Sequence, residues 1–287
     1  AKDAKVKIAN SIWVRDGLTL NDNFIKTADK FYKAKIASLE FADEKAAGEI
    51  NRWVEKATEG LIDKMVENIS KDTVAFLLNA IYFKADWLEP FDKKATAERP
   101  FYLADGTAKN HPMMYKNSEF LYLDDENFSA VKLPYNDRRF YATFILPKGN
   151  MSEFYEHLHA ENVRKWTERM RETPGTIYLP RFKYEYEFTL NDVLQALGME
   201  TAFYNADFSK MFQEALDTYI SEVKHKAVIE VNEQGSEASA ATSVVVKETA
   251  LIGEPFELEF NRPFLFMIED SLTKTILFIG EVNDPSE

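Results

Sequence analysis

The fold of this chain is decided by the stretch SEVKHKAVIEVNEQGSEASAATSVVVKETALIGEPFELEFNRPFLF, residues 221–266. Its first part, residues 221–232, alternates between two kinds of side chain, as a half-buried strand does. One side of this strand carries Val223, His225, Ala227, Ile229 and Val231. The alternation stops at residues 233–235, Glu-Gln-Gly, which we interpret as a hinge.

The residues after this hinge have an unusual composition for a loop. Within residues 236–242 every side chain except that of Glu237 is Ser, Ala or Thr. Gly, Pro, Asn and Asp, which give solvated loops their turns, are all absent between residues 236 and 251. Small side chains at alternate positions fit a segment that becomes a strand inside an existing sheet. A loop held outside a sheet that it is able to join stores free energy, and cutting the loop releases it.

Four stretches of the sequence resemble the signatures of one family, the serpins, and occur in that family's order. They are residues 233–242 with the preceding 225–227, residues 77–84 followed by Trp87 and Pro90-Phe91, residues 179–182, and the closing stretch 256–270. The resemblance extends over nearly all 287 residues. It implies an α+β serpin fold with three large mixed β-sheets, helices clustered at one end and a mobile reactive-centre loop over about residues 233–256.

Asn79 and His225 are polar residues inside otherwise apolar strand patterns. From the residues alone, Asn79 is explained by local turn chemistry or a packing accommodation, and His225 by a satisfied core position. The resemblance gives both another role, because they match the serpin shutter asparagine and histidine, a hydrogen-bonded pair. Trp87 belongs to the same shutter and breach set. Since histidine titrates near neutral pH, we hypothesise that protonation of His225 loosens the shutter.

The resemblance also assigns a hinge and a reactive bond. The hinge residues are Glu233, Gly235, Ser236, Ala238, Ala240, Ala241 and Thr242. Counting forward from Gly235 by the family's spacing places the scissile residue at Thr249, whereas counting back from Pro263-Phe264 places it at Ile252. We favour the bond between Thr249 and Ala250, with Leu251 and Ile252 as the alternatives.

The resemblance implies a suicide substrate of serine or cysteine endopeptidases. The protease forms an acyl-enzyme on the loop, and the cleaved loop inserts as a new strand and traps it. No candidate scissile residue is basic, so elastase-like or subtilisin-like targets are favoured over trypsin-like ones, whose pocket carboxylate would stay unpaired. Two alternatives stay open: a non-inhibitory serpin acting as carrier or chaperone, and a loop-bearing binding domain without insertion. The small, Ala-rich hinge favours inhibition.

Composition and absent motifs narrow the remaining classes of function. A net charge of −13 argues against a nucleic-acid partner, and no apolar run is long enough for a membrane span. The chain has no cysteine and therefore no disulfide. No nucleophile elbow, zinc-peptidase motif or phosphate-binding loop occurs, so we predict no catalytic residues, no metal, no cofactor and no enzymatic activity. A monomer in an extracellular or periplasmic compartment is expected, although the first residues lack the apolar segment of a signal peptide.

The rest of the chain predicts strands and helices without a dividing linker. Strands are expected at residues 8–14, 34–41, 73–83 and 176–188, and helices from residue 21 and at 42–65, 151–171 and 190–197. The unbroken apolar run 73–83 indicates a strand at the centre of its sheet. We therefore expect one serpin domain over residues 1–287, without the helices and strand that serpins usually carry ahead of the segment resembling residues 8–14, about the N-terminal quarter of the fold.

Overall fold

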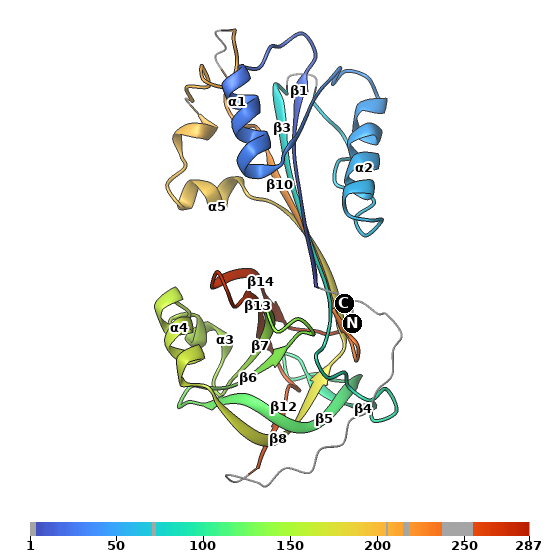
Figure 1. Cartoon of the computed structure of the whole chain (residues 1–287), viewed down its shortest axis with the longest axis vertical. Coiled ribbons are helices and arrows are strands. Elements are labelled where there is room, and N and C mark those ends of the chain that lie inside the picture. Colours follow the sequence, from blue (N-terminus) through green and yellow to red (C-terminus); the bar gives the residue numbers. More distant parts are fainter. Residues whose placement is uncertain (1–3, 71–72, 205, 215–217, 237–254, 287) are drawn as a thin grey trace. The chain divides into compact units, whose positions relative to one another are not determined.

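The computed structural model describes residues 4–70, 73–204, 206–214, 218–236 and 255–286. They form two compact units (Figure 1). Unit 1 comprises Ala1–Lys5, Lys84–Lys183 and Glu230–Glu287, and unit 2 comprises Val6–Phe83 and Tyr184–Ile229. The described residues form large mixed sheets and few helices, as the resemblance implies. One domain over residues 1–287 stays a prediction.

Most of a six-stranded mixed sheet lies in unit 2. The strand order is β2-β1-β3-β10-β9, and β11 (Gly235–Ser236) pairs with β3. These strands are β1 (Lys5–Arg15), β2 (Lys35–Leu39), β3 (Ala75–Asp86), β9 (Phe182–Thr189) and β10 (Val223–Val231). Helices α1 (Asp22–Thr27), α2 (Lys45–Ala57) and α5 (Asn191–Ala196) accompany them, with a π-helical turn at Ala28–Tyr32 and a 3₁₀ turn at Thr201–Phe203. Strand β3 is central, as its apolar run predicts.

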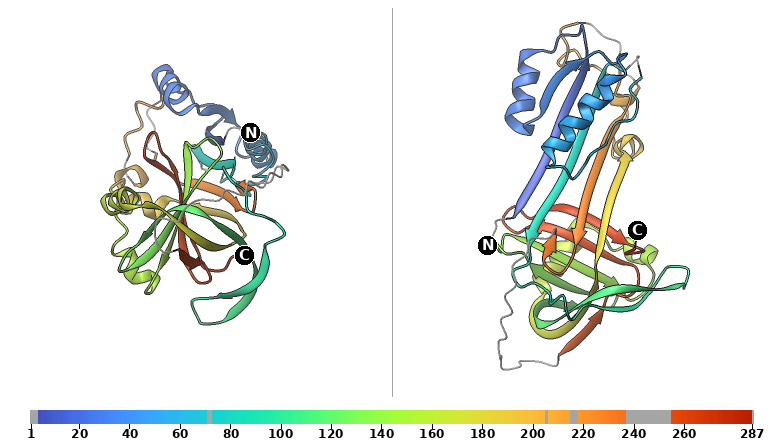
Figure 2. Two further views of the ribbon diagram at one scale, coloured as in Figure 1. Left: turned by 60° about the horizontal axis from the view of Figure 1, so that its bottom comes forward. Right: turned by 90° about the vertical axis from the view of Figure 1, so that its right-hand side faces the viewer.

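Helix α2 covers one face of the sheet in unit 2, and Figure 2 shows it lying over the strands and running along them. Ile50 and Val54 of α2 pack into a buried core with Leu78 of β3. Val228 of β10 belongs to the same core, and the next residue, Ile229, is also buried. The half-buried alternation expected for residues 221–232 is therefore wrong at this end of β10, where both faces are covered.

Helix α2 is shorter than the helix predicted over residues 42–65. The chain leaves the helix at Glu59 and Gly60, both of which have left-handed backbone conformations (φ 57° and 85°). After that point Asn51 binds the chain, because its Oδ1 accepts hydrogen bonds from the amides of Met65 (2.9 Å) and Val66 (3.0 Å). The segment thus delivers apolar side chains to the core as an extended chain, although their spacing imitates a helix.

Unit 1 is built on an eight-stranded sheet with the order β12-β8-β5-β6-β7-β13-β14, and β4 pairs with β5. The strands are β4 (Ala97–Tyr102), β5 (Ala108–Asp124), β6 (Phe128–Pro134), β7 (Phe140–Pro147), β8 (Arg171–Pro180), β12 (Phe256–Glu259), β13 (Phe264–Asp270) and β14 (Thr275–Val282). The resemblance implies three sheets, whereas the described strands form two. The reason is the long strand β5, which pairs in turn with β4, β8 and β6 and joins them into one sheet.

The single helix expected over residues 151–171 is two helices, α3 (Met151–Tyr155) and α4 (Ala160–Arg169). Between them His159 adopts an extended conformation, with φ −121° and ψ 150°. The break lets both helices reach the sheet, because the rings of Phe154 and Trp166 lie 5.6 and 4.6 Å from the ring of Phe128. Aromatic packing of this kind favours the broken form over one straight helix.

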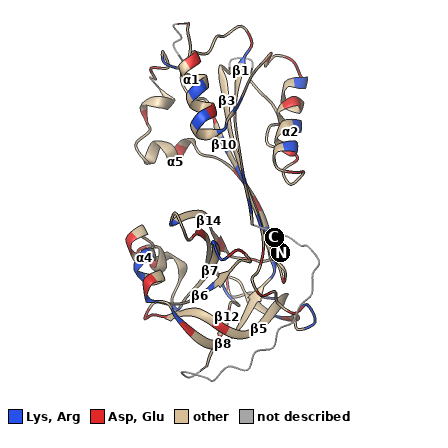
Figure 3. Ribbon diagram, viewed as in Figure 1, with Lys and Arg blue, Asp and Glu red and all other residues tan. Residues whose placement is uncertain are grey.

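The charged residues do not gather by sign on the helices. Figure 3 shows acidic and basic residues interspersed along α1, α2 and α4. Among the described residues, no helix is long and apolar enough to cross a membrane. The described residues likewise contain no group of three or more His, Cys, Asp and Glu side chains arranged to hold a metal ion.

Candidate functional site

The hinge turn, residues 232–236, is held in unit 1 mainly through its backbone. The amides of Trp87 and Phe91 donate hydrogen bonds of 2.7 Å to the carbonyls of Gln234 and Glu233. The indole Nε1 of Trp87 donates to the carbonyl of Asn232 at 2.9 Å. These bonds depend on the backbone of the hinge rather than on its side chains, so they tolerate many sequences.

Gly235 is required by its close approach to β3. Its φ is +149°, and a Cβ at this position would lie 2.1 Å from the carbonyl oxygen of Ala85. Gly235 pairs antiparallel with Asp86, and Ser236 with Ala85. The hinge signature in the sequence therefore has a physical basis, because only glycine lets these two backbones pair here.

Ser236 ends the described part of the hinge in a fully buried position. Its Oγ lies 2.8 Å from the hydroxyl of Tyr135, and either atom can be the donor. The Tyr135 ring stacks on Trp87 with 4.4 Å between centroids and 11° between planes. Burial raises the pKa of Tyr135, so the phenol stays protonated and able to bond Ser236. Sequence reasoning missed Tyr135, whose only signal is an aromatic residue at the end of an apolar strand.

Glu233 and Gln234 place polar side chains inside the protein. The carboxylate of Glu233, which is 3% exposed, accepts a 2.7 Å hydrogen bond from the hydroxyl of Thr96. The Nε of Arg181 lies 3.8 Å from the same carboxylate oxygen. The side-chain oxygen of Gln234 is buried and has no hydrogen-bond partner among the described residues. An amide oxygen that stays unpaired and away from water costs about 1–3 kcal/mol.

In unit 2, Asn79 and His225 sit side by side on β3 and β10 as register partners. The Nδ1 of His225 lies 2.8 Å from Oδ1 of Asn79. The Nδ2 of Asn79 donates to Oδ1 of Asn10 at 2.7 Å, and Nδ2 of Asn10 donates to the carbonyl of Tyr32 at 2.9 Å. We call Asn10, Asn79 and His225 the shutter chain. Asn10 was not foreseen, although it interrupts the apolar pattern of β1 as Asn79 interrupts that of β3.

The direction of the shutter chain fixes the proton of His225. A backbone carbonyl only accepts, so Asn10 donates to Tyr32 and accepts from Asn79, and Asn79 in turn accepts from His225. The histidine therefore carries its proton on Nδ1. Burial lowers its pKa, which keeps the ring neutral near pH 7. The ring also meets Phe188 edge-on, with 5.6 Å between centroids and 74° between planes.

A buried lysine on the same strand was also missed. Lys226 is 5% exposed, although the alternation of residues 221–232 groups it with the polar side chains. Its Nζ lies 2.5 Å from Glu185 and 3.5 Å from Glu187. It also donates to the carbonyl of Lys64, at 2.7 Å, in the segment that follows α2. The lysine thus links β10 to β9 and to the chain beside α2.

The other predicted site residues lie outside the described residues. These are the hinge residues Ala238, Ala240, Ala241 and Thr242, and the reactive-bond candidates Thr249, Ala250, Leu251 and Ile252. The described residues bring Glu233, Gly235 and Ser236 together with Trp87 in unit 1, and Asn79 with His225 in unit 2.

Comparisons with known proteins agree on one family. The family model described as "Serpin (serine protease inhibitor)" matches residues 1–285. An uncharacterised serpin-like protein of Thermococcus kodakarensis is 34% identical over 287 residues, covering 98% of this chain and 67% of that protein. The leukocyte elastase inhibitor of Xenopus laevis is also 34% identical, covering 98% of this chain and 77% of that protein.

Solved structures show the same likeness. The native-state crystal structure of tengpin, a thermophilic serpin, has a TM-score of 0.91 and 32% identity, covering 99% of this chain and 74% of tengpin. Human thyroxine-binding globulin has a TM-score of 0.89 and 28% identity, covering 100% of this chain and 77% of the globulin. The similarity therefore extends from end to end of the chain.

Proposed function

The chain belongs to the serpin family, and from this premise we propose that it inhibits serine endopeptidases as a suicide substrate. Serpins are protease inhibitors in general, and loop insertion is characteristic of the family. The finer proposal is that the nucleophile of a protease attacks the scissile carbonyl of this chain's loop and forms an acyl-enzyme. The cleaved loop then inserts between β3 and β10 and carries the protease with it.

The pairing of β3 supports this proposal most strongly. Strands β3 and β10 run parallel and pair directly, from Val223 with Leu77 to Val228 with Tyr82. The hinge, in contrast, pairs antiparallel with the end of β3. A strand that continued from the hinge would lie antiparallel to both neighbours and replace one parallel pair by two antiparallel pairs. Antiparallel pairing is the more stable of the two per residue, so insertion gains free energy.

The hinge register predicts where the inserted strand would lie. Gly235 pairs with Asp86 and Ser236 with Ala85, so each further residue would face one position earlier in β3. Thr242 would then lie opposite Asn79, the middle of the shutter chain. The even-numbered residues from 236 to 242 would share one face, and these are Ser, Ala, Ala and Thr, side chains small enough to fit above a packed core.

The resting hinge also contains features that favour its release. The unpaired Gln234 oxygen costs free energy in the present turn, and moving the hinge gives this group access to water. The resting turn depends on a handful of backbone hydrogen bonds, whereas a long inserted strand forms bonds along both of its edges.

For the reactive bond we retain Thr249-Ala250, with Leu251 and Ile252 as alternatives. Elastase-like or subtilisin-like proteases are the proposed targets, because all four side chains are uncharged and small or aliphatic. The name of one relative, the leukocyte elastase inhibitor, supports the first class. Other relatives include thyroxine-binding globulin in complex with thyroxine, so a carrier remains the second candidate.

Incubation with an elastase-like and a subtilisin-like protease tests the proposal. We expect a band at the summed mass that survives denaturation, together with a released peptide whose first residue is Ala250. Clean cleavage without such a band would reject inhibition. Melting the cleaved chain would then separate the alternatives, since insertion raises Tm by tens of degrees whereas a nick without insertion leaves it unchanged or lower.

A further inference from the structure

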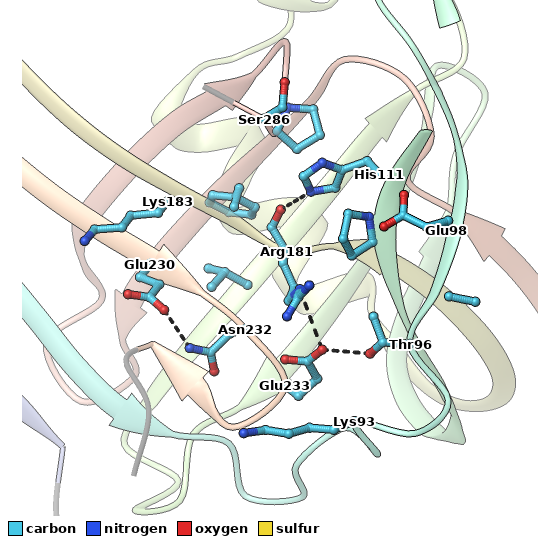
Figure 4. Close-up of a pocket in the computed structure, with 15 residues that line it drawn as sticks. Lys93, Thr96, Glu98, His111, Arg181, Lys183, Glu230, Asn232, Glu233 and Ser286 are labelled. Atoms are coloured by element: carbon cyan, nitrogen blue, oxygen red, sulfur yellow. Dashed lines mark hydrogen bonds and ion pairs between the residues drawn. The ribbon is translucent and has the colours of Figure 1, made fainter. Parts of the chain in front are cut away.

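Unit 1 contains a cavity of about 860 Å³ that opens beside the hinge turn. Its walls come from the β4–β5 hairpin, the junction of β8 and β9, the end of β10 and the C-terminal residues 285–286 (Figure 4). This volume lies in the range of cavities that hold small organic ligands. The hinge and shutter do not require an open space here, so the cavity calls for its own explanation.

Three cationic side chains line this cavity. Figure 4 shows the guanidinium of Arg181 in the middle, between Lys93 and Lys183. Within the described part of the chain, neither lysine has an ion-pair or hydrogen-bond partner. Arg181 forms an ion pair with the buried carboxylate of Glu233, from which its Nε lies 3.8 Å away, and its side chain is 47% exposed. This ion pair uses Nε, and the two terminal nitrogens of the guanidinium remain for a ligand.

Three acidic side chains also line the cavity. Glu230 accepts a 2.9 Å hydrogen bond from Nδ2 of Asn232, and Glu233 accepts one from Thr96. Glu98 is the third carboxylate of the lining, and it is exposed to solvent. Three cations and three carboxylates therefore line the cavity, and the guanidinium of Arg181 is the charged group that lies in its middle.

The remaining lining supplies an apolar wall. Pro112, Phe182, Val231 and Pro285 line the same cavity. The ring of His111 is fixed beside them by its Nε2, which lies 2.5 Å from the carbonyl oxygen of Arg181. A ligand for this site therefore needs an anionic end and an apolar body.

We propose that this cavity binds a small organic carboxylate, with the carboxylate on the guanidinium of Arg181 and the apolar body against Pro112, Val231 and Pro285. Arginine binds carboxylates through two parallel hydrogen bonds. Because Arg181 approaches Glu233 through Nε, its two terminal nitrogens can form such a pair of bonds with a ligand. Lys93 and Lys183 add attraction from the two sides. The basis of the proposal is the coincidence of a cavity, an apolar wall, two lysines that line it, and an arginine that approaches Glu233 through Nε.

The site shares residues with the hinge. Asn232 and Glu233 line the cavity, and their carbonyls accept the hydrogen bonds from Trp87 and Phe91 that hold the hinge turn. A ligand that binds only the present arrangement stabilises it, and by linkage slows any movement of the hinge. This coupling rests on the proposed function, whereas binding itself does not.

Titration calorimetry with 4-phenylbutyrate tests the site, with 4-phenylbutan-1-ol and inorganic phosphate as comparison probes. We expect the carboxylate to bind at least about tenfold more tightly than the alcohol, because only the carboxylate pairs with Arg181. It should also bind more tightly than phosphate, which has no apolar body. Equal affinity for carboxylate and alcohol, or for carboxylate and phosphate, overturns the proposal.

The affinities of variants for 4-phenylbutyrate show which side chains bind the probe. Arg181→Met should weaken 4-phenylbutyrate binding about tenfold or more, and Lys93→Met and Lys183→Met about threefold each. Lys94→Met is the matched control, because Lys94 neighbours Lys93 in the sequence but does not line the cavity. Its affinity should stay within about twofold of the parent chain. If Lys94→Met loses as much affinity as Arg181→Met, the effect does not come from the cavity and the site is rejected.

A protease assay with and without 4-phenylbutyrate then measures the coupling between ligand binding in the cavity and movement of the hinge. Saturating probe should slow formation of the covalent complex. A chain that binds the probe but never traps a protease rejects the proposed function and leaves the binding site intact, whereas trapping without any binding rejects the site alone.

Discussion

The hinge turn and the shutter chain hold their parts of the six-stranded sheet in different ways. The hinge is fixed by backbone hydrogen bonds to Trp87 and Phe91, by a glycine against a carbonyl and by the buried Ser236–Tyr135 contact. The shutter chain is a relay of side-chain hydrogen bonds from His225 through Asn79 and Asn10 to a carbonyl. Substitutions should therefore disrupt the hinge through steric conflict and burial, and the shutter through loss of particular donors and acceptors.

The largest effect is expected at Gly235. In Gly235→Val, the new side chain meets the carbonyl oxygen of Ala85, 2.1 Å from its Cβ, at a φ that valine does not adopt. We expect a loss of about 4 kcal/mol in the free energy of unfolding, measured by urea denaturation.

Gly48→Ala is the control for this substitution. Gly48 lies in α2, where nothing lies within 4 Å of an added Cβ, so alanine should stabilise the chain by up to about 1 kcal/mol. A Gly235→Val variant as stable as the parent chain would show that the hinge does not pair with β3 in solution.

The Ser236–Tyr135 contact tests whether burial or hydrogen bonding dominates at the hinge. Tyr135→Phe leaves the buried Ser236 hydroxyl without its partner and should cost about 1–3 kcal/mol. Ser236→Ala in the same background should recover most of that loss, because no unpaired group remains. A double-mutant cycle of urea midpoints measures the coupling. Additive losses would mean that the two hydroxyls do not interact.

The shutter chain should respond to pH through His225. Burial lowers the pKa of folded His225, so its contribution to stability is present above the unfolded value near 6.5 and is lost as the pH falls toward the folded pKa. His225→Asn keeps a donor for Asn79 but does not titrate, so its stability should vary less over the same range.

The measurement is the free energy of unfolding from pH 7.5 to 5 in the parent and in His225→Asn, at about 0.5 kcal/mol precision. A parallel fall in both chains would assign the pH dependence to other groups. It would also reject the hypothesis that protonation of His225 opens the shutter.

The hinge turn and the shutter chain also differ in how much of each could be predicted from the sequence. The break in alternation at residues 233–235 and the resemblance to a family signature identified the hinge from one chain. The structure adds the steric reason for its glycine. The partners Tyr135, which follows β6, and Asn10, which lies on β1, are far away in sequence, and only the fold shows that they meet Ser236 and Asn79.

Local patterns misled in two places for the same physical reason. Apolar spacing predicted a helix through residue 65, but Asn51 binds the segment as an extended chain, a tertiary contact that overrides helix propensity. Alternation placed Lys226 among exposed polar residues, but β9 supplies two carboxylates that allow its burial.

Lys226 gives the smallest predicted effect, although it is the most buried charge on β10. Lys226→Met keeps the length of the side chain and removes both the ammonium and its desolvation cost. The partners Glu185 and Glu187, 48% and 37% exposed, remain hydrated when the lysine is lost. We expect stability within about 1 kcal/mol of the parent, because the lost attraction and the lost desolvation penalty nearly cancel. A loss of several kcal/mol would instead mean that the bond to the Lys64 carbonyl fixes the segment after α2, so that β10 depends on this side chain as the hinge depends on Gly235.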